Sequence, residues 1–401
     1  MTRFTQLLDL SYKSPDGGEV SEEESLDLYL PEQGLEDETA PSTLSSSKSH
    51  KVKPALLIFV HGGAWRTGDK KNHRGMAERI VTDHLSFHND QQSPSSSPPP
   101  VAVALINYRL STRVDPEDEE SPAKVIHPAH IKDVYDALTF LKEQGGERGR
   151  FRGSYDHQLF HLVGHSVGAW MALGAATLPS IDQPKGDGVH SPFGMPVLGE
   201  NVRRSIRSFV LVDGIYDLTS LLEEYPSYAS FVNQATLRTG ASWGKTPREI
   251  FGPISSPSWR LAQSYSDDLV VPRLHLLHSK DDELLSLRQT LEAFVDLSEK
   301  FDRKLEQTTI QEEGMQTEKT VDFPDHGLAL LSPELTKEGE VGEIGDEKEK
   351  PKVSIKDRFH PLPFRSKPYL NIDLTTLHGS HDGLLDTQTF SDLLLKIVRG
   401  G

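Results

Sequence analysis

The chain of 401 residues contains no cysteine, and this absence excludes disulfide bonds, thiolate metal ligands and a cysteine nucleophile. Long apolar runs are also missing. No stretch approaches the roughly 18 apolar residues of a membrane-spanning helix. The first ten residues lack an apolar segment long enough for a signal peptide. We therefore expect a cytoplasmic protein that does not contact the membrane.

Basic residues are scarce relative to acidic ones: 43 Lys and Arg stand against 60 Asp and Glu, a formal charge of −17. This balance argues against nucleic acid or an anionic membrane surface as a partner. Hydrophobic residues make up 35% of the chain, a low share that suggests an ordinary core diluted by polar insertions. We predict a single domain over residues 1–401 with flexible insertions near 31–53, 88–100, 182–204 and 305–360.

Apolar runs typical of buried strands alternate with amphipathic helical patterns through most of the chain. The expected strands are 55–60, 101–108, 159–163, 206–212, 273–278 and 370–377, with two edge strands at 4–11 and 26–30. The expected helices are 72–88, 128–143, 287–301 and 386–398. This alternation predicts an α/β protein whose mainly parallel sheet has helices on both faces. The segment 217–265 is too long for a simple connection and predicts a cap region.

The central motif is Gly164-His165-Ser166-Val167-Gly168. It follows an apolar strand and precedes a helix of small and apolar residues. Strand, Gly-x-Ser-x-Gly and helix in this order form the nucleophile elbow of the α/β-hydrolase fold, with Ser166 as the candidate nucleophile. The alternative is a Gly-rich turn in which Ser166 only caps the helix.

A serine nucleophile needs a base, and the base needs an acid that holds its tautomer. In this fold the acid and then the base follow later strands of the chain. The strand at 273–278 runs into three consecutive carboxylates, and the residues alone do not choose among them: Asp281, Asp282 and Glu283. Two acids after the preceding strand, Asp213 and Asp217, are competitors. A solvated loop that caps the next helix is the alternative.

For the base, the strand at 370–377 runs into a loop with two histidines. Because the base is expected a few residues beyond the end of the strand, we favour His381, with His378 as the alternative. A third candidate, His326, lies in the long polar stretch and has no convincing strand before it.

Acyl transfer also requires donors for the developing oxyanion. One is the backbone N–H of Val167, directly after the candidate nucleophile. The second is expected in the loop after an early strand, where the sequence reads His61-Gly62-Gly63-Ala64-Trp65. Glycine allows the backbone to approach a substrate carbonyl closely. The alternative is a Gly-Gly turn in which Trp65 is a core aromatic residue.

The motif at 61–65, together with 164–169, resembles the kynurenine formamidases of the fungal type within the α/β-hydrolase superfamily. The stretches at 127–128, 213–218 and 225–231 resemble that family too. The stretch at 278–285 is similar to its pattern of His-Ser, two residues, then Asp-Glu-Leu, which implies that Asp282 is the acid. The last motif of the family, Gly-x-His-Asp, falls on residues 379–382, which agrees with His381 as the base. The resemblance covers about 55–398, but the chain is longer than the family and carries Leu384 and Leu385 where an aromatic residue is common.

This resemblance implies hydrolysis of N-formyl-L-kynurenine to L-kynurenine and formate, without a metal or organic cofactor. It makes a homodimer reasonable. Three aromatic residues are expected to line the pocket for the kynurenine ring: Trp65, Tyr216 and Tyr228. Two other functions use parts of the same sequence. A general carboxylesterase or arylesterase needs the same residues, and a non-catalytic binding protein with this fold needs none of them.

Overall fold

The computed structural model describes residues 4–13, 21–31, 52–83, 99–115, 117, 121, 123–176, 198–236, 272–300, 302–303, 369–370 and 372–400. The chain divides into two units, residues 1–306 with 368–401, and residues 307–367. All described residues belong to the first unit. Most of the predicted insertions, and the candidate His326, lie outside the described residues. The single domain over 1–401 stays a prediction.

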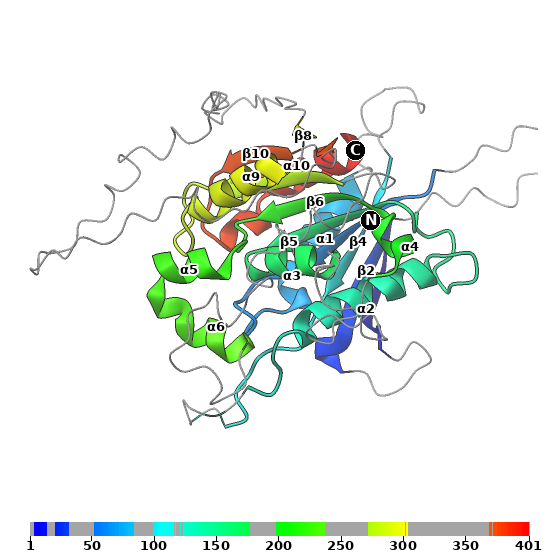
Figure 1. Cartoon of the computed structure of the whole chain (residues 1–401). Coiled ribbons are helices and arrows are strands. Elements are labelled where there is room, and N and C mark those ends of the chain that lie inside the picture. Colours follow the sequence, from blue (N-terminus) through cyan, green and yellow to red (C-terminus); the bar gives the residue numbers. More distant parts are fainter. Residues whose placement is uncertain are drawn as a thin grey trace, which may run out of the picture. The chain divides into compact units, whose positions relative to one another are not determined.

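An eight-stranded sheet forms the framework of the first unit (Figure 1). Its order is β1-β2-β4-β3-β5-β6-β7-β10. The pairs β1–β2 and β2–β4 are antiparallel, and all other neighbours are parallel. The strands are β1 (Phe4–Ser11), β2 (Ser25–Pro31), β3 (Ala55–Val60), β4 (Val101–Ile106), β5 (Phe160–His165), β6 (Ile206–Val212), β7 (Arg273–Ser279) and β10 (Ile372–Leu377). The mainly parallel sheet is confirmed.

Strands β3, β4 and β5 are buried at every residue, because helices cover both faces of a parallel sheet. Their apolar runs therefore made them predictable. At the antiparallel edge, the residues of β1 are partly or fully exposed except for Ser11, which is buried. The strand expected at 370–377 is divided, since β9 (Tyr369–Leu370) pairs with β8 (Asp302–Arg303) while β10 pairs with β7.

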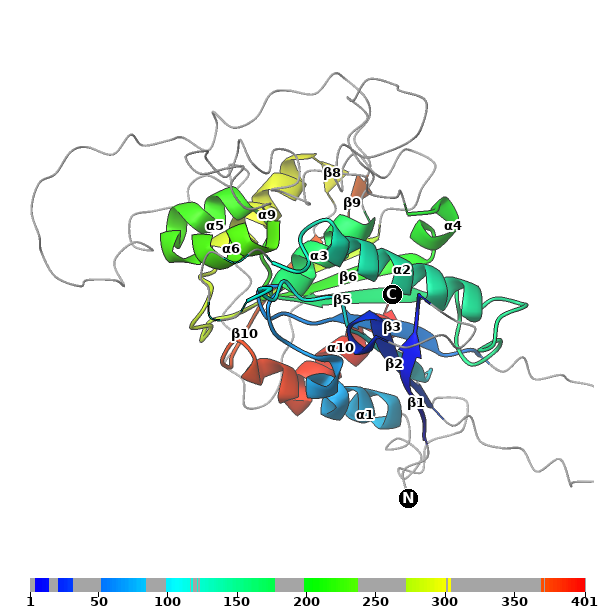
Figure 2. The ribbon, with the colours of Figure 1, turned by 90° about the horizontal axis from the view of Figure 1, so that it is seen from below.

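Helices cover the two faces of the sheet as predicted (Figure 2). On one face, α2 (Ala129–Gln144) contacts α3 (Val167–Ala176), and every residue of α3 is buried. On the other face, α1 (Arg74–Thr82) contacts α10 (Gln388–Gly400). The helix α9 (Arg288–Lys300) contacts β7. No helix in the described part of the chain is long and apolar enough to cross a membrane.

Short helices occupy loops around this framework. The helix expected at 72–88 starts as a 3-10 helix, η2 (Lys70–His73), before α1, and residues 84–88 lie outside the described part. Helix α4 (Glu200–Arg203) precedes β6. The predicted cap begins with α5 (Leu218–Glu224), η5 (Pro226–Tyr228) and α6 (Ala229–Thr236), and residues 237–271 lie outside the described part. The 3-10 helices η1 (Glu22–Glu24) and η9 (Gly383–Asp386) complete the set.

Candidate active site

Ser166 lies at the carboxyl end of β5, directly before the first residue of α3, Val167. Its φ of +53° is in the left-handed region, which a residue with a side chain seldom adopts. The turn is possible because its flanking glycines lack side chains. A Cβ on Gly168 would lie 2.2 Å from the carbonyl oxygen of Val60. In a nucleophile elbow such a strained turn presents the serine hydroxyl at the end of the sheet, and the Val167 N–H is among those that open α3 without an intrahelical partner.

The structure brings Asp282 and His381 together, one from the loop after β7 and one from the loop after β10. The Nδ1 atom of His381 donates to Oδ2 of Asp282 at 2.8 Å. Both side chains are shielded from solvent, with exposed fractions of 0% and 3%. The other carboxylate oxygen, Oδ1, accepts the N–H groups of Leu284 and Leu285 at 2.8 and 2.9 Å. With Nδ1 holding a proton, Nε2 is left as the basic atom.

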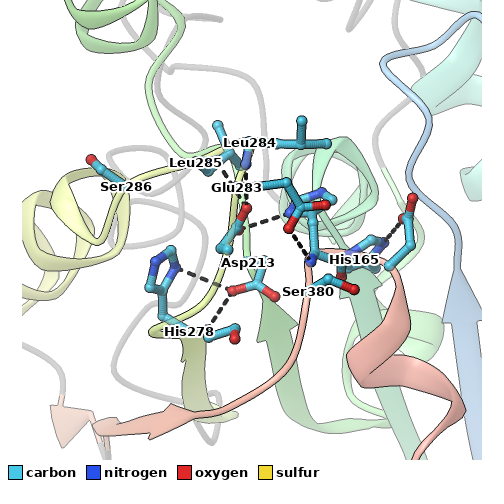
Figure 3. Close-up of polar contacts among 12 residues, drawn as sticks. His165, Asp213, His278, Glu283, Leu284, Leu285, Ser286 and Ser380 are labelled. Atoms are coloured by element: carbon cyan, nitrogen blue, oxygen red, sulfur yellow. Dashed lines mark hydrogen bonds and ion pairs between the residues drawn. The ribbon is translucent and has the colours of Figure 1, made fainter. Parts of the chain in front are cut away.

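The neighbouring acids contact other groups in the same loops. Asp281 accepts hydrogen bonds from His378 Nδ1 and the Gly379 N–H, each at 3.0 Å, and both side chains are more than half exposed. Glu283 accepts the backbone N–H of His381 at 3.0 Å. These contacts fix the His381 loop from two sides, and Figure 3 shows Glu283 among the residues drawn there.

His165 connects the elbow to the His381 loop, a contact that the sequence analysis did not predict. Its Nε2–H donates to the carbonyl oxygen of His381 at 3.0 Å, and the two rings lie 4.6 Å apart. Burial lowers the pKa of His165 well below its ordinary value, so the ring is neutral. In the described structure Ser166 Oγ makes no hydrogen bond to His381, so attack requires these two side chains to approach each other. Catalytic hydrogen bonds are often long before substrate binds.

Burial alone would lower the pKa of His381, but its hydrogen bond to Asp282 and the charge of that carboxylate raise it above the ordinary 6.5. Burial works in the opposite direction on Asp282. There the hydrogen bond and charge of His381, with two backbone N–H groups, bring the pKa below the ordinary value. The pair is thus arranged to favour an imidazolium beside a carboxylate.

The turn after β3 lies against the elbow. A Cβ on Gly62 would be 2.9 Å from Cβ of Ser166. The next three residues, Gly63, Ala64 and Trp65, all have positive φ, at +96°, +51° and +58°. Such a run is costly for residues with side chains, about 1–2 kcal/mol each, and is typical of sites where backbone groups are aimed at a ligand.

Tyr108, after β4, holds this turn in place, and the sequence analysis did not single it out. Its hydroxyl contacts the carbonyl oxygens of Gly62 at 2.7 Å and His61 at 3.2 Å. The His61 ring donates from Nδ1 to the same Gly62 oxygen at 2.8 Å and stacks on the Tyr108 ring. A trans peptide is planar, so fixing the Gly62 carbonyl fixes the Gly63 N–H in the opposite direction. The sequence analysis placed Tyr108 inside the expected strand at 101–108, whereas β4 ends at Ile106 and Tyr108 lies in the loop after it.

The three aromatic residues predicted as pocket walls have different environments. Trp65 is fully buried and packs edge-on against Trp170 of α3, and Tyr216 is buried as well. Tyr228 is partly exposed and donates to the carbonyl oxygen of Leu284 at 2.8 Å. It also lies 5.0 Å from the ring of Phe231, which in turn neighbours Trp65. Tyr228 is therefore the one of the three with accessible surface.

The two competing acids after β6 have different structural roles. Asp217 caps α5, because its carboxylate accepts the Ser220 N–H at 2.8 Å. Asp213 is buried beside His278 (Figure 3). Two groups of described side chains are close enough to share a cation, His165 with Asp213 and His381, and Asp213 with His278 and Asp282. In the first group, hydrogen bonds already occupy Nε2 of His165 and Nδ1 of His381.

Comparison with known proteins gives consistent matches. Residues 44–292 match the family model BD-FAE. The kynurenine formamidase of Meyerozyma guilliermondii is 31% identical over 234 residues, covering 58% of this chain and 68% of that protein. The kynurenine formamidase of Eremothecium gossypii is 30% identical over 237 residues, covering 59% and 76%. That of Saccharomyces cerevisiae is 27% identical, covering 62% and 77%.

Solved structures give weaker matches. A truncated carbohydrate esterase from gut microbiota has a TM-score of 0.49 at 16% identity, covering 99% of this chain and 97% of that one. An esterase B from Lactobacillus rhamnosis has a TM-score of 0.47 at 18% identity, covering 73% and 71%. The fold assignment rests on the strand order and the family matches.

Proposed function

Because the chain belongs to the BD-FAE family and to the kynurenine formamidases, we propose that it hydrolyses N-formyl-L-kynurenine to L-kynurenine and formate, using Ser166, Asp282 and His381. The observation that carries the proposal is the buried hydrogen bond of 2.8 Å between Asp282 and His381. It leaves a basic Nε2 at the strand ends where the elbow presents Ser166.

In the acylation step, Ser166 Oγ attacks the formyl carbon and His381 Nε2 takes the hydroxyl proton. Asp282 stabilises the imidazolium through Nδ1. The C–N bond then breaks, and His381 returns the proton to the departing aryl amine, which gives L-kynurenine and a formyl ester on Ser166. In the second step, water attacks the ester with His381 as base, and formate leaves as Ser166 regains its proton.

The oxyanion of each tetrahedral intermediate is stabilised by backbone donors. We assign this role to the N–H of Val167 and to N–H groups of the Gly63-Ala64 turn. Support comes from the left-handed run at 63–65 and from the two donors that fix the Gly62 carbonyl. His61 and Trp65 stabilise this turn and take no part in the chemical steps. His61 is neutral, since burial lowers its pKa to about 4.

We assign the kynurenine ring to the aromatic surface at Tyr228, with Trp65 and Tyr216 as deeper walls that contact substrate only if neighbouring side chains move. The α-carboxylate of the substrate needs a cation. Arg66 directly follows the turn and lies 5.1 Å from the ring centroid of Phe231. Within the described residues it has no ion pair, and burial and then the like charge of Arg113 lower its pKa.

The test compares purified protein on N-formyl-L-kynurenine and on a p-nitrophenyl ester. We expect the formamide to have the higher kcat/KM. A preference for the ester by orders of magnitude would instead make the protein a general esterase. A fluorophosphonate probe should label the native chain and not Ser166→Ala, and absence of labelling in the native chain would favour a non-catalytic binding protein.

We further propose that the enzyme is a cytoplasmic homodimer, as the family resemblance implies. Cell fractionation tests the location, and sedimentation equilibrium tests the oligomeric state. A monomer across the accessible concentration range would exclude the dimer without affecting the chemistry.

A further inference from the structure

Asp213 holds a carboxylate that the proposed mechanism does not use. It follows β6 directly, its side chain is completely buried, and its backbone has a φ of +43°. Its Oδ1 accepts the N–H of Ser279 at 2.7 Å and lies 3.2 Å from Nδ1 of His278. Its Oδ2 is buried and has no hydrogen-bond partner in the part of the chain that the structure describes. A buried acceptor without a partner is costly, which suggests that this carboxylate has a role beyond packing.

The neighbours of this carboxylate belong to the candidate site. One Asp213 oxygen and one nitrogen each of His165 and His381 lie within 4.8 Å of one another. A second group at the same spacing contains Asp213, His278 and Asp282. Asp213 thus lies beside both members of the hydrogen-bonded Asp282–His381 pair.

The backbone also ties Asp213 to the elbow. The Ser166 N–H donates to the carbonyl oxygen of Val212 at 2.9 Å, and the Ile215 N–H donates to the backbone carbonyl oxygen of Ser166 at 3.2 Å. The Asp213 N–H donates to Leu277 of β7 at 2.9 Å. Two consecutive strand ends, those of β5 and β6, therefore each carry a left-handed residue with a polar side chain, and hydrogen bonds fix them to each other.

We propose that Asp213 is a positioning residue, a second carboxylate that acts on His381 beside Asp282 and takes over as its acid partner when Asp282 is removed. The proposal rests on the function assigned above to Ser166, Asp282 and His381. The takeover requires a local movement, because one Asp213 oxygen is already within 4.8 Å of a ring nitrogen of His381.

The groups that face Asp213 come from every neighbouring element: His165 at the end of β5, Tyr216 after β6, His278 in β7, Asp282 and Glu283 in the next loop, and His381 after β10. Burial first, and then the charges of Asp282 and Glu283, raise the pKa of Asp213 to about 7, against the opposing Ser279 N–H and His381. His278 is neutral, since burial lowers its pKa to about 4. Asp213 therefore gains its charge in the range where His381 must lose its own, and that charge raises the pKa of His381.

The first experiment is the pH profile of kcat/KM for Asp213→Asn, which keeps the shape and the acceptor at Oδ1 but removes the charge. We expect the acid limb to move to lower pH by about half a unit, with kcat several-fold lower and KM unchanged. The matched control is Asp133→Asn, another fully buried carboxylate, which pairs with Lys13 and Arg109 and is not among the groups that face Asp213. It should lower Tm and leave the profile in place.

The second experiment is a double-mutant cycle. In the Asp282→Asn background, adding Asp213→Asn should remove at least about tenfold more activity than it removes from the native enzyme. An unchanged acid limb together with additive effects would overturn the proposal. If Asp213→Asn does not fold, the test is made on the native enzyme. Its rate of fluorophosphonate labelling should depend on pH through two ionisations near neutral pH, those of His381 and Asp213. A dependence on a single ionisation would overturn the proposal.

All rates are measured on N-formyl-L-kynurenine and on p-nitrophenyl acetate. If the formamide is not turned over while the ester shows the shifted profile, the proposed substrate is wrong and the role of Asp213 stands. If the formamide is turned over without the shift, the substrate stands and the role of Asp213 fails.

Discussion

Asp282 accepts a hydrogen bond from His381 at 2.8 Å, and only one residue earlier Asp281 accepts one from His378 at 3.0 Å. The two pairs have the same chemistry and different surroundings. The first is buried and the second is more than half exposed. Exposed ion pairs contribute little to stability, whereas removing one partner of a buried pair is costly.

Substitution of the two acids distinguishes the pairs. Asp282→Asn should lower kcat by about 10³-fold, because the amide no longer favours the His381 tautomer with a basic Nε2 and Asp213 replaces the carboxylate only in part. Asp281→Asn should stay within a few-fold of the native enzyme. Steady-state kinetics on N-formyl-L-kynurenine measure both. A larger loss from Asp281→Asn would transfer the acid role to the exposed pair.

The pH dependence follows from the shifted pKa of His381. The base must be neutral to accept the Ser166 proton, and its pKa lies above the ordinary 6.5. Activity should therefore fall as the pH drops, with a midpoint above 6.5 in kcat/KM. The carboxylate of Asp282 stays ionised through this range, since its pKa lies below the ordinary value. An acid limb with its midpoint clearly below 6.5 would contradict the Asp282–His381 assignment.

Tyr108→Phe tests the turn after β3. The variant keeps the ring that stacks on His61 and loses the hydroxyl that contacts the Gly62 carbonyl. Loss of a direct oxyanion donor costs about 10²–10³-fold in kcat. Tyr108 only orients such a donor, so we expect a loss of about tenfold, with KM nearly constant. Tyr155→Phe is the control, because its hydroxyl also donates to a buried carbonyl, that of Leu141, away from the site. Equal kcat losses in the two variants would refute the orienting role.

Arg66→Met tests recognition of the substrate carboxylate. Methionine can still pack on Phe231 but has no charge. The kcat/KM for N-formyl-L-kynurenine should fall about tenfold, as expected for a hydrogen bond to a charged group. Formanilide, an aryl formamide without the amino acid group, should be hydrolysed equally by the variant and the native enzyme. Equal losses on both substrates would show that Arg66 does not bind the carboxylate.

Much of the fold could be predicted because burial on both faces makes a parallel strand apolar along its whole length. Strands β3 and β6 coincide with the predicted runs at 55–60 and 206–212. The order of the strands in the sheet has no such local signal, since it depends on which crossovers pack together. The break between β9 and β10 was also not predictable, because the partner of β9 is β8, more than 60 residues earlier.

At the candidate site, position after a strand indicated the loops but did not resolve adjacent residues. Asp281 and Asp282 are equivalent in composition and spacing, and only the family resemblance chose between them. The structure pairs each with a different histidine. Tyr108 and His165 were not predicted because they act through backbone carbonyls, and a carbonyl acceptor leaves no pattern of residue types in the sequence.

The turn at Gly63, Ala64 and Trp65 has the backbone handedness that D-amino acids prefer. In a chain of L-residues such a turn is held by its surroundings, here the carbonyl contacts of Tyr108 and His61 and the packing of Trp65 on Trp170. A single D-alanine placed at position 64 by chemical ligation would remove the steric conflict at that residue. With the mirror-image residue, the native backbone conformation at position 64 should be free of strain. The conformation of the turn would then depend less on stabilisation by its aromatic neighbours.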